Sequence, residues 1–174
     1  MYNINLQEMD LDGADGTCDF QNCHISDLDI DTASGDVYYQ GTIGTLDFDA
    51  ASASFVGEFT NTPSRIDMDS MSGDLDITLP SDAGFTVTMD ALSSQFHSDF
   101  DYSHTNGGFL HGNGHCRITM DAMSGDLYIR EYKTANAVPE IPAATEAHHH
   151  TDACTTDPES CPDNATHHTE AHHG

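Results

Sequence analysis

The chain has 174 residues, of which 30 are Asp or Glu and only 4 are Lys or Arg, so its formal net charge is −26. This balance argues against nucleic acid and anionic membrane surfaces as partners, because both are bound through clustered Lys and Arg. No apolar run approaches the roughly 18 residues of a membrane-spanning helix, and no basic start followed by an apolar stretch indicates a signal peptide. We therefore expect no direct membrane span, and partners that are cations or basic surfaces.

A short motif, Asp-x-x-Ser-Gly-Asp, recurs at residues 31–36, 69–74 and 121–126, and two fainter copies lie between these. We take the first Asp of each copy as its origin, which gives Asp31, Asp49, Asp69, Asp90 and Asp121. Successive origins are separated by 18, 20, 21 and 31 residues. A repeat near 20 residues is typical of solenoid proteins, in which each copy forms one coil.

Around each origin, apolar residues recur at fixed positions. Three residues before the origin stand Leu28, Leu46, Ile66, Val87 and Ile118. One residue before it stand Ile30, Phe48, Met68, Met89 and Met120. Two residues after it stand Ala33, Ala51, Met71, Leu92 and Met123, and six after it stand Val37, Phe55, Leu75, Phe96 and Leu127. Alternation of these apolar columns with polar residues predicts half-buried strands on both sides of a tight corner, and we expect the columns to be buried together.

These features predict an all-β fold for residues 1–133. A coil with one apolar face cannot bury that face alone, but coils stacked about 4.8 Å apart bury it continuously. The expected architecture is a β-solenoid, a single-stranded β-helix-like stack of about five coils of about 20 residues each. The long last interval contains residues 102–116, rich in Gly, Asn and His, which we expect to form an excursion on one side of the stack.

The repeated Ser-Gly-Asp corners resemble those of a bacterial domain family of unknown function that carries the label adhesin and is built of β-strand repeats. The resemblance covers about residues 20–133 and includes the segment 79–85, Leu-Pro-Ser-Asp-Ala-Gly-Phe, and the Gly-rich stretch 107–114. It implies a β-solenoid-like domain, associated with the bacterial envelope through an anchor or a stress-response system, and it brings no catalytic residues. No anchor is evident in this chain. The leading hypothesis is a non-enzymatic structural or interaction module.

The stacked origin residues are the first candidate site. Neighbouring carboxylates about 4.8 Å apart would repel each other by roughly 1 kcal/mol in water. Splaying into solvent, hydrogen bonds within each corner, or bound Ca²⁺ would relieve this repulsion, since Ca²⁺ prefers carboxylate and carbonyl oxygens. The calcium hypothesis names a ladder of Asp31, Asp49, Asp69, Asp90 and Asp121.

Other chemistry is weakly represented in the first 133 residues. Every Asp of the repeat has equivalents, so no pair stands out as a catalytic one, and nucleophile and phosphate-loop motifs are absent. Cys18 and Cys23-His24 form either half of a metal hook or two unrelated small residues. Four histidines, His97, His104, His111 and His115, cluster around the expected excursion and predict a polar loop. We therefore expect no enzyme activity.

Residues 134–174 form a second region, which contains no aromatic residue and no Leu but four Pro and seven His. A segment without large apolar side chains cannot offset its ordering entropy, so we expect a disordered acidic tail. Imidazole and thiolate groups suit Zn²⁺ and Ni²⁺. The candidate ligands are His148, His149, His150, Cys154, Cys161, His167, His168, His172 and His173. With the Asp ladder they support an alternative function, the binding or buffering of divalent metals.

Overall fold

The computed structural model of the chain describes residues 1–133, so the tail and its nine candidate metal ligands lie outside the described residues. Residues 1–133 contain twelve strands and no helix, which confirms the all-β prediction. The strands are β1 (Asn5–Gly13), β2 (Cys18–Ser34), β3 (Val37–Ser52), β4 (Phe55–Phe59), β5 (Arg65–Ser72), β6 (Leu75–Leu79), β7 (Phe85–Ser93), β8 (Phe96–Ser98), β9 (Ser103–Thr105), β10 (Gly108–His111), β11 (Cys116–Ser124) and β12 (Leu127–Glu131). Nothing in this part of the chain forms a helix long and apolar enough to cross a membrane.

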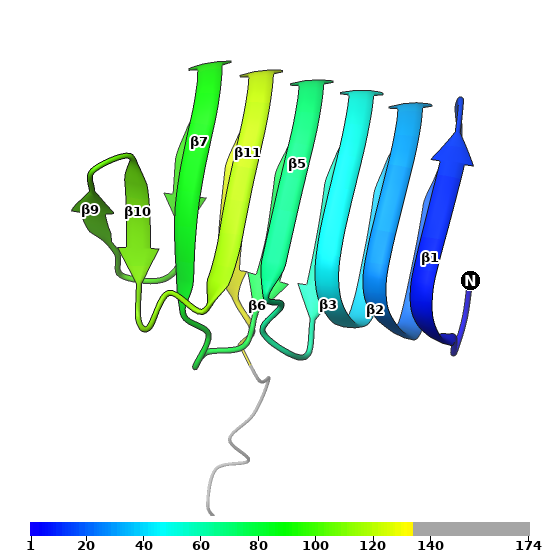
Figure 1. The fold of residues 1–174 in the computed structure, drawn as a ribbon, viewed down its shortest axis with the longest axis horizontal. Coiled ribbons are helices and arrows are strands. Elements are labelled where there is room, and N and C mark those ends of the chain that lie inside the picture. Colours follow the sequence, from blue (N-terminus) through cyan, green and yellow to red (C-terminus); the bar gives the residue numbers. More distant parts are fainter. Residues whose placement is uncertain (134–174) are drawn as a thin grey trace, which may run out of the picture. The chain divides into compact units, whose positions relative to one another are not determined.

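The strands form two walls of parallel strands joined by the long strands β2 and β3 (Figure 1). The front wall runs in the order β1, β2, β3, β5, β11, β7. The rear wall runs in the order β2, β3, β4, β6, β12, β8. Strand β3 takes part in both walls, because residues 37–41 pair with β4 and residues 45–52 pair with β5. Each coil therefore contributes one segment to each wall, as in a solenoid.

The order of the coils in space differs from their order in the sequence. The last copy, β11 and β12, lies between the coil of β5 and β6 and the coil of β7 and β8. The chain therefore skips one position after β6, forms the outermost coil, and returns to fill the gap. Residues 102–116 make this return possible, and they include the β9–β10 hairpin, whose second strand pairs antiparallel with β7 (Figure 1). The predicted excursion is thus confirmed.

The apolar column three residues before the origin is buried throughout, as predicted. Its exposed fractions are at most 2%, with Ile66 and Ile118 fully buried. The column one residue before the origin is buried in all copies except Met89, which is half-buried at the end of the stack. On the rear wall, Leu75 and Leu127 are fully buried, whereas Phe96 in the end strand is half-buried. The core is therefore the space between the two walls, and burial decreases at the ends.

The column two residues after the origin was expected to be buried, and this prediction is wrong. Met71, Leu92 and Met123 are 61%, 84% and 55% exposed. In a strand, side chains alternate between faces, so a residue two positions after an outward-facing Asp also points outward. The inward position is instead the one directly after the origin, where Ala122 is buried. The exposed Ala, Met and Leu side chains form an apolar rim along the corner of the front wall.

The Gly-Asp pair of each motif builds the corner between the walls. The Oδ1 atom of Asp74 accepts a hydrogen bond from the backbone N–H of Asp126 at 2.8 Å, and Asp126 accepts one from the N–H of Gln95 at 2.8 Å. Gly125 has a φ of +136°, and a Cβ there would lie 2.0 Å from the carbonyl oxygen of Gly73 in the adjacent coil. The motif thus combines close backbone approach with hydrogen bonds from one coil to the next.

Candidate functional site

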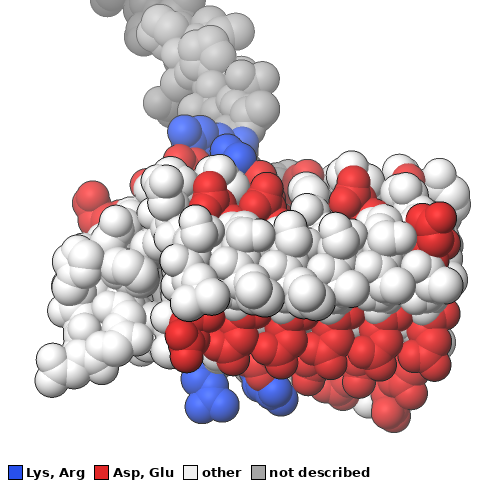
Figure 2. All heavy atoms as spheres, turned by 90° about the horizontal axis from the view of Figure 1, so that it is seen from above, with Lys and Arg blue, Asp and Glu red and all other residues white. Residues whose placement is uncertain are grey.

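The outward face of the front wall carries two in-register ladders of acidic side chains, which we call the acidic wall. The first ladder consists, in spatial order, of Asp12, Asp31, Asp49, Asp69, Asp121 and Asp90. The second consists of Asp10, Asp29, Asp47 and Asp67, and it continues as Thr119 and Thr88. Figure 2 shows these residues as a nearly continuous acidic band beside the uncharged apolar rim.

The five origin residues predicted from the sequence are therefore brought together on one wall, with Asp121 between Asp69 and Asp90. Asp12 is an additional member of the first ladder that was not among the predicted origins, because residues 9–12 were not recognised as a copy of the repeat. The residues Met9-Asp10-Leu11-Asp12 do fit the pattern of alternating apolar and acidic positions, 19 residues before Asp31. This spacing is the signal that identifies the additional strand.

Two carboxyl groups of the acidic wall, Asp29 and Asp49, have raised pKa values because they are partly desolvated and have acidic neighbours. Partial desolvation, followed by the charges of the neighbouring carboxylates, raises the pKa of Asp49 above its ordinary value. The same causes raise the pKa of Asp29, where Asp47 and Asp31 are the largest neighbouring charges. A carboxyl group whose pKa is raised on folding stabilises the folded state more in acid than at neutral pH, so ionised Asp29 and Asp49 each lower the stability of the fold at neutral pH.

One cation relieves the second ladder, and one hydroxyl binds an acidic side chain next to it. Arg65 forms an ion pair with Asp67 and lies 3.6 Å from a carboxylate oxygen of Asp47. Thr45 donates a hydrogen bond from its hydroxyl to Asp27 at 2.7 Å. In residues 1–133, no ion pair or side-chain hydrogen bond involves a side chain of the first ladder, so the hydrogen bonds expected within each corner are not formed by the origin Asp. The first ladder is thus the unpartnered part of the wall.

A shallow groove of about 820 Å³ runs along the top of the first ladder. Its lining includes the carboxylates of Asp31, Asp49 and Asp69 and, on the apolar rim, Ala51 and Met71. The groove therefore offers negative charge on one side and aliphatic contacts on the other. This pairing matches the chemistry of Lys and Arg side chains, which carry a cationic head on an aliphatic stem.

Residues 1–133 contain no group of three or more His, Cys, Asp or Glu side chains placed to hold a metal ion. The calcium ladder and the Zn²⁺ or Ni²⁺ site in the tail remain predictions. The metal hook considered for Cys18 and Cys23-His24 does not form, because Cys23 is fully buried in the core and His24 Nδ1 lies 2.7 Å from the hydroxyl of Thr42. Cys116 is also a core thiol, and its burial raises its pKa to about 12.

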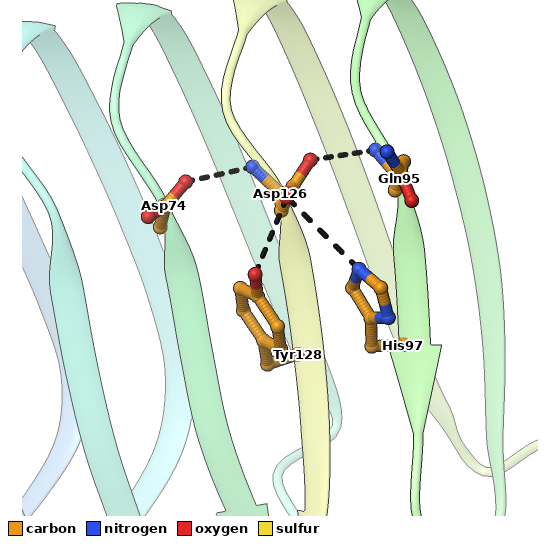
Figure 3. A network of polar contacts seen from close by, with 5 residues as sticks. All are labelled: Asp74, Gln95, His97, Asp126 and Tyr128. Atoms are coloured by element: carbon orange, nitrogen blue, oxygen red, sulfur yellow. Dashed lines mark hydrogen bonds and ion pairs between the residues drawn. The ribbon is translucent and has the colours of Figure 1, made fainter.

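The histidines expected in a polar loop are distributed over several elements. His97 lies on β8, where its ring stacks on Tyr128 at a centroid distance of 4.7 Å. Figure 3 shows both residues converging on Asp126, with the Tyr128 hydroxyl 3.2 Å and His97 Nε2 4.0 Å from the carboxylate oxygen Oδ2. His104 on β9 and His111 on β10 belong to the hairpin itself, where their rings pack on Phe109 and on Phe85 of β7. The Asp126 cluster joins three adjacent coils, and we assign it a structural role.

Together, the parallel coils, the inter-coil hydrogen bonds and the acidic wall define a solenoid-like β-repeat domain. Residues 1–130 match the Toastrack DUF4097 family, a domain family of unknown function, over most of the chain. The chain belongs to this family. No curated protein and no solved structure matches it.

Proposed function

We propose that the domain is a non-enzymatic interaction module whose acidic wall binds a cationic surface or segment of another polypeptide. The observation that carries this proposal is the register of the two ladders, which fixes carboxylates on neighbouring strands at intervals of about 4.8 Å on one wall. A surface of one sign attracts an oppositely charged partner over a distance of several ångströms and raises its association rate. The acidic wall repels nucleic acids and anionic lipids by the same force.

The apolar rim supports a polypeptide as the partner, rather than an inorganic cation alone. Met71 and Met123 are more than half exposed beside the carboxylates, where they can pack against the stems of Lys and Arg. Contacts of this kind increase the affinity for a cation that is attached to an aliphatic chain. An adhesin-type role at the bacterial envelope is part of the proposal, and it is supported by the resemblance of the Ser-Gly-Asp repeats rather than by the geometry of the wall.

Removal of three charges from the middle of the first ladder should weaken the binding of a cationic probe. We expect the triple variant Asp31→Asn, Asp49→Asn, Asp69→Asn to bind an oligolysine peptide about ten-fold less tightly at low salt, because each exposed charge pair contributes about 0.2–1 kcal/mol. Binding by the unchanged protein should also weaken steeply between about 50 mM and about 500 mM NaCl, since salt screens exposed charges. Isothermal titration calorimetry measures both effects.

The matched control has the same change in net charge away from the acidic wall. Asp19→Asn, Asp82→Asn and Asp101→Asn alter three exposed residues of the rear wall and the loops. This control should bind oligolysine almost as tightly as the unchanged protein. Equal weakening by both triple variants would show that only the net charge matters and would overturn the proposal for the acidic wall.

A further inference from the structure

Strand β1 is the end strand of the front wall, and one of its edges has no partner. It pairs with β2 along its length, and no other strand of residues 1–133 pairs with it (Figure 1). The strand is nine residues long and contains no Pro. An edge of this kind presents unpaired backbone N–H and C=O groups, which can form a ladder with an extended chain. The opposite end of the wall differs, because β10 covers residues 85–87 of β7.

The core is incompletely covered at the β1 end. Met9 and Leu11 point inward but are only half-buried, whereas their register partners on β2, Leu28 and Ile30, are 2% and 1% exposed. The inward residues of β2 lie between two coils, and those of β1 have a neighbour on one side. An added strand with inward-facing apolar side chains would therefore bury Met9 and Leu11 as the inner coils are buried.

A cavity of about 170 Å³ opens beside this end of the core. Its apolar lining comes from Leu11 on β1, Ile30 on β2 and Val37 on β3, together with Cys18. A cavity of about 150 Å³ accommodates a group the size of benzene, so this one has room for one large aliphatic side chain. It lies beside Leu11, and an aliphatic residue paired opposite Leu11 would be close to it.

The outward face of β1 limits which strand can pair with its edge. Glu8, Asp10 and Asp12 occupy alternate positions, and β1 has no Lys or Arg. Pairing with the β1 strand of a second copy would set this acidic row against itself, and like charges on opposing strands are destabilising. A strand with Lys or Arg at alternate positions would instead place cations opposite the row.

We propose that the free edge of β1 is a strand-addition site for an extended segment of a partner polypeptide in which Lys or Arg alternates with aliphatic residues. The backbone ladder supplies affinity, the aliphatic residues cover Met9 and Leu11, and the basic residues face Glu8, Asp10 and Asp12. This inference deepens the proposed function by giving the cationic partner a defined docking strand, and it rests on that function for the sign of the partner's charge.

The test uses the full chain and two probe peptides of the same composition. The first, acetyl-Thr-Val-Lys-Ile-Lys-Leu-Lys-Val-Thr-amide, alternates Lys with aliphatic residues, and the second, acetyl-Thr-Lys-Lys-Lys-Val-Ile-Leu-Val-Thr-amide, separates them. We expect the alternating peptide to bind more tightly. At a concentration about ten times its Kd, it should slow hydrogen exchange of the outer amides of β1 about ten-fold, because exchange then requires the uncommon free form.

Two charge variants separate the edge site from general attraction to the acidic wall. Asp10→Asn with Asp12→Asn removes two charges at the β1 end, and Asp121→Asn with Asp90→Asn removes two from the far end of the first ladder. The β1-end pair should weaken binding of the alternating peptide about three- to ten-fold, and the far-end pair should have little effect. Equal effects of the two pairs would overturn the edge site and leave the acidic wall as a diffuse binding surface, still testable with oligolysine.

Three further results would also contradict the inference. These are equal affinities of the two peptides, unchanged exchange of the β1 amides at saturation, and sedimentation of the peptide-free chain as a dimer whose β1 amides are already protected. The last result would mean that a second copy occupies the edge.

Discussion

The substitution Leu75→Ala is expected to lower the free energy of unfolding by about 2–5 kcal/mol, the range for large-to-small changes in a packed core. Leu75 on β6 is fully buried, and its register partners are Phe55 on β4 and Leu127 on β12. The coils on both sides hold the surrounding backbone in place, so the cavity left by the substitution cannot collapse. Urea titration followed by circular dichroism measures the loss.

Leu92→Ala provides the matched control for this experiment. Leu92 is 84% exposed on the apolar rim, so its truncation should change stability by no more than about 0.5 kcal/mol. A loss below about 1 kcal/mol for Leu75→Ala, or equal losses for the two variants, would show that the space between the walls is not the core.

Gly125→Ala is expected to destabilise the fold by about 3 kcal/mol or more, because two costs are combined. A residue with a side chain at a φ of +136° is strained by about 1–3 kcal/mol. The added Cβ would also lie 2.0 Å from the carbonyl oxygen of Gly73, so the two coils would have to separate at the corner. Separation would disturb the hydrogen bond from the N–H of Asp126 to Asp74.

Gly16 occupies the same corner position in the first coil and separates these two costs. Its φ is +133°, but no atom lies within 4 Å of an added Cβ. Gly16→Ala should therefore cost only the backbone strain, about 1–3 kcal/mol. Thermal unfolding of both variants measures the difference, and a loss for Gly125→Ala no greater than that for Gly16→Ala would show that the coils are not in close contact at the corner.

The period-two pattern was sufficient to predict strands, corners and most of the core. It predicted burial of Leu28 and its equivalents, because inward positions of stacked coils must be apolar in every copy. The prediction was wrong for Met71 and Met123, which were assigned to the core because an apolar residue recurs at their position in every copy. They lie two residues after the outward-facing Asp and therefore also point outward. The recurrence of apolar residues does not by itself distinguish the exposed rim from the core. The distinction requires the rule that strand residues two positions apart point to the same face of the sheet.

The order of the coils could not be read from the repeat. The copies share the same alternation of apolar and polar residues, so the pattern does not say whether β11 pairs with β5 or with β7, and in the fold it pairs with both. The long interval between Asp90 and Asp121 indicated an excursion but not its destination. Equivalent positions of the repeat align whatever the order in which the coils stack. The ladder of carboxylates could therefore be predicted from the sequence, whereas the order of the coils could not.

The edge of β1 and the relief of the second ladder depend on tertiary structure. The corner of the first copy has Asp15 where the other copies have Ser, so the sequence of β1 and its corner does not match the repeat motif. Arg65 reaches Asp47 only because β5 lies beside β3. Contacts of this kind follow from the register between strands, which local patterns do not specify.

The most direct test of the account is a disulfide assay of the order of strands in the acidic wall. Neighbouring strands lie about 4.8 Å apart and second neighbours about 9.6 Å apart, whereas a disulfide requires Cα atoms about 4.4–6.8 Å apart. Asp69 pairs with Asp121, and Asp121 pairs with Asp90. After mild oxidation and peptide mapping by mass spectrometry, the variant with Asp69→Cys and Asp121→Cys should contain the engineered disulfide, and the variant with Asp69→Cys and Asp90→Cys should lack it. A disulfide between positions 69 and 90, with none between positions 69 and 121, would contradict the insertion of the last coil and the acidic wall built on it.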